Sequence, residues 1–161
     1  MPINIDITLK SSKWLKHKTF FNKVLKNRIN DILLHFPNLV DKEIELSIVV
    51  ANNRIVGNLN KKYRKIDKTT NVLSFSSHND LLKNIPNTPI IHLGDIILSY
   101  EQVFKESQEQ EKKFYDHITH LIFHSFLHLL GYSHCKEKER LKMEKLEIEF
   151  LNKIKIKNPY I

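Results

Sequence analysis

The chain has 161 residues and a mass of 19.1 kDa; 41% of its residues are hydrophobic and 27% are charged. This size and composition predict one packed domain spanning residues 1–161 and exclude disordered, collagen-like and coiled-coil proteins. The net charge of +8 favours a nucleic-acid partner, but 22 of the 26 basic residues are lysine. Because lysine codons are rich in A and T, the charge by itself indicates either RNA binding or genomic base composition.

The N-terminal part of the chain predicts a strand and then a helix. Apolar residues alternate from Ile3 to Leu9, as in a half-buried strand, and this segment lacks the apolar core of a signal peptide. Thr19 is placed to cap a helix that Pro37 would end. Six apolar residues recur between them at helical spacing: Phe20, Val24, Ile29, Ile32, Leu33 and Phe36.

The central part of the chain predicts most of a sheet. Runs of β-branched and apolar residues predict three further strands, at 43–51, 71–75 and 90–99. A short helix is predicted at 52–63, broken near Gly57, and the polar segment 77–89 is predicted to be a loop.

The C-terminal part predicts helices at 100–112, 113–130 and 136–151. This order of elements predicts an α+β fold, with a small mixed sheet of about four strands packed with helices. The apolar stretch 118–132 is interrupted by three histidines and is too short for a membrane span, so no membrane association is expected. Cys135 is the single cysteine, which excludes an intrachain disulfide and favours a reducing cytoplasm.

Four histidines fall within the predicted helix 113–130: His117, His120, His124 and His128. Their spacings of three, four and four residues place them on one face of that helix. Gly131 can end the helix in the left-handed conformation that glycine adopts without strain. The chain would then turn back and bring His134 toward the last two helical histidines.

The segment HSFLHLLGYSH therefore predicts a metal site formed by His124, His128 and His134. Three neutral histidines that leave one position open are typical of catalytic zinc, and the alternative is a pair of core histidines satisfied by hydrogen bonds. Zinc peptidases with this spacing have a glutamate after the first histidine, whereas this chain has Ser125, which cannot deprotonate water. A bound metal would still lower the pKa of water to about 7 and polarise a phosphoryl oxygen.

The residues beside this segment have more than one interpretation. His120 could donate a hydrogen bond to a ligand, shuttle a proton or bind the metal itself, or it could be a partly buried histidine bonded to the backbone. His117, one turn further away, is expected to be structural. Cys135 follows His134 directly, and because neighbouring side chains point apart we expect an ordinary thiol rather than a ligand.

Three blocks of the sequence resemble the YbeY-type endoribonucleases, which are bacterial rRNA maturation factors. The blocks are HLIFHSFLHLLGYSH at 120–134, followed by Met143, Glu144 and Leu146; LNKKYRKIDKTTNVLSF at 59–75; and LGDIILS at 93–99. The terminal NPYI is also similar to some members, while the first 58 residues carry no specific motif.

The resemblance implies a fold akin to zinc metallopeptidase catalytic domains, with one zinc ion per chain held by His124, His128 and His134. It implies cleavage of single-stranded RNA during 3′-end maturation of the small-subunit (16S) rRNA, and a part in ribosome quality control. It also implies association with small-subunit ribosomal proteins and an assembly GTPase.

Arg64 matches the arginine in the family's Tyr-Arg block, and we expect Arg64 and His120 to be the catalytic residues. A guanidinium group can hold a phosphate through two hydrogen bonds, which suits a nuclease. The alternatives for Arg64 are an ion pair with Asp67 or a bond to a helix-terminal carbonyl. Asp95 could orient a metal ligand or simply shape a turn.

Three serines depart from the family pattern. Ser125 stands where glycine is usual, Ser133 where aspartate is usual, and Ser76 where proline is frequent. A carboxylate at position 133 could orient a ligand, so its absence bears on activity. Asn71 and Ser74 are expected to position the third strand at the edge of the cleft.

These observations leave one leading function and two alternatives. The leading hypothesis is a metal-dependent endoribonuclease. The first alternative is a non-catalytic rRNA-binding ribosome-assembly factor whose metal is structural. The second is a peptidase, which Ser125 disfavours.

Overall fold

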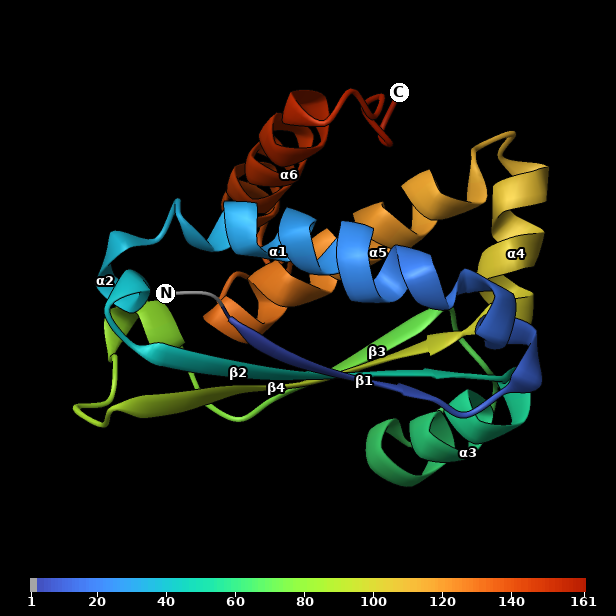
Figure 1. Ribbon diagram of the computed structural model, residues 1–161, viewed down its shortest axis with the longest axis horizontal. Coiled ribbons are helices and arrows are strands. Elements are labelled where there is room, and N and C mark those ends of the chain that lie inside the picture. The colour runs from blue at the N-terminus through green and yellow to red at the C-terminus, as the bar shows by residue number, and fades with distance from the viewer. Residues whose placement is uncertain (1–2) are drawn as a thin grey trace.

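The computed structural model describes residues 3–161, in which four strands form one mixed sheet of order β1-β2-β4-β3 (Figure 1). Strands β1 (Asn4–Leu9), β2 (Glu43–Ala51) and β4 (Ile90–Ser99) run parallel to one another. Strand β3 (Val72–Ser76) pairs antiparallel with β4 and leaves its other side unpaired at the edge of the sheet. The predicted α+β fold with a small mixed sheet is confirmed.

Helices cover both faces of this sheet (Figure 1). Helices α1 and α5 lie on one face, α3 lies on the other, and α6 packs on α5. The α-helices are α1 (Lys26–Leu33), α2 (Pro37–Val40), α3 (Asn53–Arg64), α4 (Tyr100–Glu109), α5 (Phe114–Leu130) and α6 (Glu137–Lys153). Shorter 3-10 segments are Ser12–His17 and Leu81–Lys83, and Phe20–Leu25 is a π-helical turn. Within residues 3–161, no helix combines the length and apolar character of a membrane span.

The core consists of a large apolar cluster on the α5 face of the sheet and a small one beneath α3. The small cluster contains Ala51, Val56, Leu73 and Ile97, so α3 buries few side chains. The large cluster includes most buried residues of α1, α5 and the central strands. Helix α5, which carries the predicted metal ligands, is therefore held in the best-packed part of the protein.

Gly94 shifts the register of β4 in the middle of the strand. Leu93 and Ile96 both belong to the large cluster although they are three residues apart, because one extra residue is inserted between them. Gly94 has φ +142°, and a Cβ atom there would lie 2.1 Å from the carbonyl oxygen of Phe75. The bulge therefore requires glycine, and it decides which residues of β4 face α5.

The bulge places Asp95 away from the histidines. Asp95 alternates with Ile96 and so lies on the same face as Ile97, which packs beneath α3. The expectation that Asp95 orients a metal ligand is therefore wrong, because its side chain lies on the opposite face of the sheet from α5.

The predicted N-terminal helix begins earlier than expected. Thr19 was expected to cap it, but Thr19 has helical φ and ψ angles and its side chain makes no capping bond. The chain is already helical from Ser12, and the Ser11 side chain accepts a 3.4 Å bond from the Lys13 N–H. Pro37 was expected to end the helix, whereas α1 ends at Leu33 and Pro37 occupies the first turn of α2.

The π-helical turn also changes which residues are buried. Phe21, Leu25 and Ile29 are fully buried at intervals of four residues, while Val24 is 40% exposed. A π turn contains more residues than an α turn and rotates the following helix, so the expected face was wrong at Val24.

Helix α3 is continuous through Gly57, so the predicted break near this residue is wrong. The Asn52 side chain accepts a 2.9 Å bond from the Ile55 N–H and caps the helix. Lys65, with φ 62°, ends it. These ends and the buried Val56 offset the cost of about 1 kcal/mol for an interior glycine.

Candidate metal centre and active site

Helix α5 ends as its sequence predicts. Gly131 adopts φ +110°, and its N–H donates to the carbonyl oxygen of His128 over 3.0 Å. The next N–H, from Tyr132, donates to the carbonyl oxygen of Leu127 over 3.0 Å. This pair of bonds closes the helix and turns the chain back toward α5. The turn brings His134 beside the last histidines of the helix.

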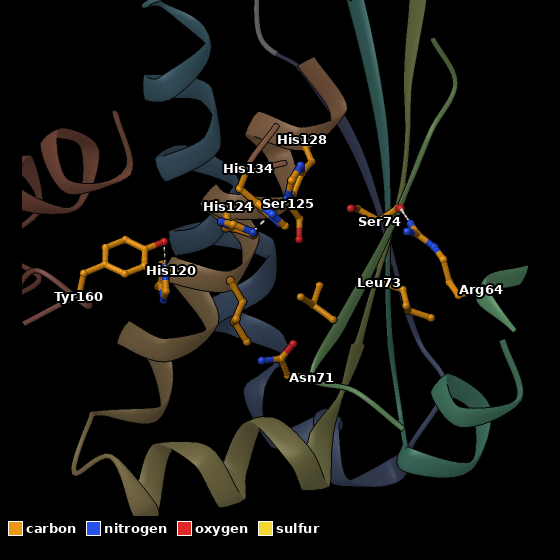
Figure 2. Close-up of a pocket in the computed structure, with 12 residues that line it drawn as sticks. Arg64, Asn71, Leu73, Ser74, His120, His124, Ser125, His128, His134 and Tyr160 are labelled. Carbon is orange, nitrogen blue, oxygen red and sulfur yellow. Dashed lines mark hydrogen bonds between the residues drawn. The ribbon is translucent and has the colours of Figure 1, made fainter. Parts of the chain in front are cut away.

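His124, His128 and His134 lie close enough to bind one metal ion. One ring nitrogen from each lies within 4.8 Å of the others. The Nε2 atoms of His124 and His128 are 3.1 Å apart, close to the spacing of about 3.4 Å expected for two zinc ligands in tetrahedral geometry. Figure 2 shows the three rings converging at the end of the helix. The structure therefore contains the predicted trio in a metal-binding arrangement.

Two of these rings are oriented by acceptors behind them. His124 Nδ1 lies 2.9 Å from Oε1 of Glu147, and His128 Nδ1 lies 3.0 Å from the main-chain carbonyl oxygen of Tyr132. Both partners are acceptors, so each Nδ1 carries the proton and each Nε2 is left with its lone pair when the ring is neutral. Two lone pairs facing each other across 3.1 Å repel unless a cation lies between them. The donor set therefore fits a metal ion.

Burial keeps one of the rings neutral. Desolvation by burial, together with the nearby His124, lowers the pKa of His128 to about 4. At neutral pH the His128 ring carries no second proton that a metal would need to displace.

Glu147 of α6 is a site residue that the sequence did not identify. Its side chain is fully buried, and burial alone would raise its pKa. Hydrogen bonds from His120 and His124 outweigh burial and lower the pKa to about 2, so the carboxylate is ionised. The sequence does contain one indication of its role. Glu147 falls in the buried stripe of α6, four residues from each of its apolar neighbours Met143 and Leu151.

Tyr160 and His120 complete the surroundings of Glu147. The Tyr160 hydroxyl donates to the carboxylate and lies 3.0 Å from both oxygens. His120 Nε2 lies 3.3 Å from Oε1 of Glu147 and 3.4 Å from the Tyr160 hydroxyl, while its buried Nδ1 has no hydrogen-bond partner among the described residues. Burial and the Glu147 charge raise the pKa of Tyr160, so it remains a donor. His120 therefore lies beside the metal ligands with its Nε2 engaged.

Arg64 faces the histidines from the opposite wall of a pocket of about 330 Å³. It ends α3 on the other face of the sheet, and Figure 2 shows Ser74 of the edge strand between Arg64 and the histidines. One guanidinium nitrogen donates to the Ser74 carbonyl oxygen over 2.7 Å, and the group lies over the Phe75 ring, 5.4 Å from its centroid. Among the described residues, the alternative ion pair of Arg64 with Asp67 is not present, and Asp67 lies instead 3.7 Å from Lys61.

A buried network joins the two walls of the pocket. Glu106 of α4 accepts a 2.9 Å bond from Asn71, at the start of β3, and lies 2.8 Å from Nε2 of His117 on α5. Burial lowers the pKa of His117. The hydrogen bond to Glu106 and the negative charge of Glu106 raise this pKa, but by less than burial lowers it. Asn71 and Ser74 both line the pocket, and His117 is structural in position.

The serines that depart from the family pattern make local contacts. Ser125 is buried and lines the pocket. The Ser133 hydroxyl accepts a 3.1 Å bond from the Cys135 N–H, so it stabilises the turn that carries His134. Cys135 is exposed and is not part of the histidine cluster. The Ser76 hydroxyl donates to the His78 carbonyl oxygen over 2.7 Å.

The pocket between the two walls has an unusual charge composition. Its walls contain Arg64 and four histidines but, among the residues that the structure describes, no aspartate or glutamate. Glu147 lies behind His124, where it is fully buried and surrounded by donors. The pocket therefore offers cationic and hydrogen-bonding groups to an anion, and no exposed carboxylate to act as the base of a peptidase.

Comparisons with known proteins identify the family of this chain. A profile of the family described as Endoribonuclease YbeY matches residues 7–155. Endoribonuclease YbeY from Bartonella quintana (strain Toulouse) is 38% identical over 161 residues, which cover 98% of this chain and 97% of that protein. The solution structure of TM1509 from Thermotoga maritima has a TM-score of 0.58 at 21% identity, covering 93% of this chain and 91% of that one, and supports the fold. The chain thus belongs to the YbeY endoribonuclease family.

Proposed function

We propose that this protein is a zinc-dependent endoribonuclease, one domain over residues 1–161, that cleaves single-stranded RNA. The observation that carries the proposal is the shared pocket, in which a histidine trio faces Arg64 and no described carboxylate is exposed. A phosphodiester is an anion, and this composition favours its entry. The name of the Bartonella relative, an endoribonuclease, supports the same assignment.

The histidine trio and Arg64 would have separate roles in this reaction. His124, His128 and His134 would hold the ion, and zinc bound there would supply a Lewis acid able to polarise a phosphoryl oxygen and to lower the pKa of water. Arg64 has five N–H groups, of which one is bonded to Ser74, so it retains donors for a phosphate. The guanidinium stabilises negative charge that grows on the phosphate oxygens.

His120 is the second proposed catalytic residue. It lines the pocket one helical turn before His124, and its Nδ1 atom, which has no hydrogen-bond partner among the described residues, would hold or move the proton. The contacts of Nε2 with Glu147 and Tyr160 keep the ring in place for this role.

Family membership supports a proposal for the biological setting. We propose that the RNA is the 3′ end of small-subunit (16S) rRNA, and that the protein acts in the cytoplasm in rRNA maturation and ribosome quality control. Small-subunit ribosomal proteins and an assembly GTPase are the proposed partners. The exposed cations at the end of α3, namely Lys61, Lys62, Arg64 and Lys65, support binding of an RNA chain beside the pocket.

A cleavage assay with metal analysis tests the function. The wild-type protein, His124→Ala and His92→Ala are incubated with a small-subunit rRNA 3′ fragment, and the zinc content of each sample is measured. His92 lies on β4 outside the cluster and serves as the matched control. We expect cleavage by wild type and His92→Ala alone. RNA binding without cleavage by zinc-loaded wild type would instead support the assembly-factor alternative.

A further inference from the structure

Glu147 is a fully buried carboxylate that has no lysine or arginine partner within the described residues. A carboxylate that is fully removed from water needs an opposite charge or a complete set of hydrogen-bond donors. Among residues 3–161, no lysine or arginine lies within 4.0 Å of Glu147, and its ionic contacts are the two histidines His120 and His124. His124 also belongs to the histidine trio, so a metal ion held there would place its positive charge on the other side of the His124 ring.

The donors around Glu147 are arranged to fit this carboxylate. Oε1 receives His124 Nδ1 at 2.9 Å and the Tyr160 hydroxyl at 3.0 Å, with His120 Nε2 at 3.3 Å. These groups come from α5 and from the C-terminal segment, while Glu147 comes from α6. Three segments of the chain therefore meet at one carboxylate directly behind a metal ligand.

We propose that Glu147 is a positioning residue of the metal centre: it fixes the orientation of His124 and balances the charge of the ion, and Tyr160 holds the carboxylate in place. This role rests on the proposed zinc site. A carboxylate behind a histidine ligand raises the basicity of the ring and selects the nitrogen that faces the metal. Tight metal binding then depends on the C-terminal segment, although no residue of that segment is a ligand.

The test compares zinc affinity with the stability of the metal-free protein. Glu147→Leu removes the carboxylate and fills its space with an apolar side chain. We expect zinc affinity, measured by competition with a chelator, to fall between 10- and 100-fold. The unfolding midpoint of the metal-free protein should fall in Glu147→Leu, because the donors of His120, His124 and Tyr160 lose their acceptor. A residue that only stabilises the fold would lower this midpoint and leave the zinc affinity of the folded variant unchanged.

Two milder variants keep the test decisive if Glu147→Leu does not fold. Glu147→Gln keeps the shape but removes the charge, and we expect about a tenfold loss of zinc affinity. Tyr160→Phe removes one donor and should weaken zinc binding severalfold without changing the fold. Glu149→Gln changes an exposed glutamate of the same helix and should leave zinc affinity unchanged.

Nuclear magnetic resonance of the histidine side chains gives an independent result. In zinc-loaded wild type, the Nδ1 proton of His124 should be protected from exchange with solvent, and Glu147→Gln should reduce this protection. Wild-type zinc affinity in both Glu147 variants would overturn the positioning role while leaving the nuclease assignment intact. A wild-type protein that binds no zinc would overturn both.

Discussion

The two walls of the pocket are built in opposite ways. The histidine wall belongs to the packed centre of the protein: Glu147 is fully buried behind it, and His124 and His128 are each fixed by a bond to Nδ1. The arginine wall consists of the last residue of α3 and the free edge of β3, and Arg64 is exposed and attached by a single bond to a carbonyl. If the proposed function is correct, the histidine wall is formed before RNA arrives, whereas the arginine wall can adjust to the RNA.

The largest effect is expected on the rigid wall. His128→Ala removes one of the three proposed ligands, and the next histidine along the helix, His120, already contacts Glu147. We expect complete loss of the single zinc equivalent, measured by metal analysis, and complete loss of RNA cleavage. If the variant kept one equivalent of zinc, His120 or Cys135 would have to be a ligand, and the assigned trio would be wrong.

A smaller effect is expected on the exposed wall, where zinc should be retained. Arg64→Lys keeps the positive charge but loses the planar pair of donors, so RNA binding should be nearly unchanged. Turnover should fall roughly a hundredfold, which is typical of losing one preorganised donor in a transition state. The measurement is kcat at equal zinc content.

The matched control for Arg64→Lys is Arg54→Lys, since Arg54 is exposed near the other end of α3. It should behave like wild type. Parental turnover by Arg64→Lys would show that Arg64 contributes charge alone. The arginine wall and the histidine wall would then differ mainly in how deeply their residues are buried, and less in the chemistry that those residues perform.

The salt dependence of RNA binding should be a property of the exposed wall as well. Each phosphate that a lysine neutralises on single-stranded RNA contributes about −0.7 to the slope of log affinity against log salt concentration. Lys61→Gln combined with Lys62→Gln should make this slope shallower by about 1.4, measured by fluorescence titration.

Two exposed lysines of α6, changed as Lys138→Gln with Lys145→Gln, provide the same change of net charge on another surface. That pair should leave the slope unchanged. A wild-type protein whose RNA affinity is insensitive to salt would show that the charge of +8 reflects base composition.

The smallest expected effect concerns the network that joins the walls. Burial lowers the pKa of His117 below its ordinary value of 6.5, so unfolding releases a ring that binds protons more readily. The stability that depends on neutral His117 is therefore complete above pH 6.5 and is lost as the pH falls through the lowered pKa. The unfolding midpoint of wild type should therefore decrease as the pH is lowered from about 8 to about 5.

His117→Gln tests this assignment because glutamine can donate to Glu106 without titrating. Its unfolding midpoint should fall less steeply with pH than that of wild type over the same interval. Equal slopes for the two proteins would place the acid sensitivity elsewhere, for example at His128.

The sequence by itself determined the parts of the site that depend on local geometry. Helical periodicity places His124 and His128 on one face, and Gly131 reverses the chain so that His134 returns to them. The individual strands were equally predictable, because they are runs of β-branched and apolar residues. The helical spacing, the turn and each single strand require only residues that are close together in the chain.

The tertiary structure decided the contacts between residues that are distant in the sequence. Periodicity shows that Glu147 lies in the buried stripe of α6, but the packing of α6 on α5 decides that it meets His124, 23 residues away. Likewise, the bulge at Gly94 turns Asp95 away from the site, and the end of α3 brings Arg64 to the edge of β3. A sequence pattern specifies which face of an element is buried, whereas the register between elements, which depends on the packing of the whole core, selects the partner.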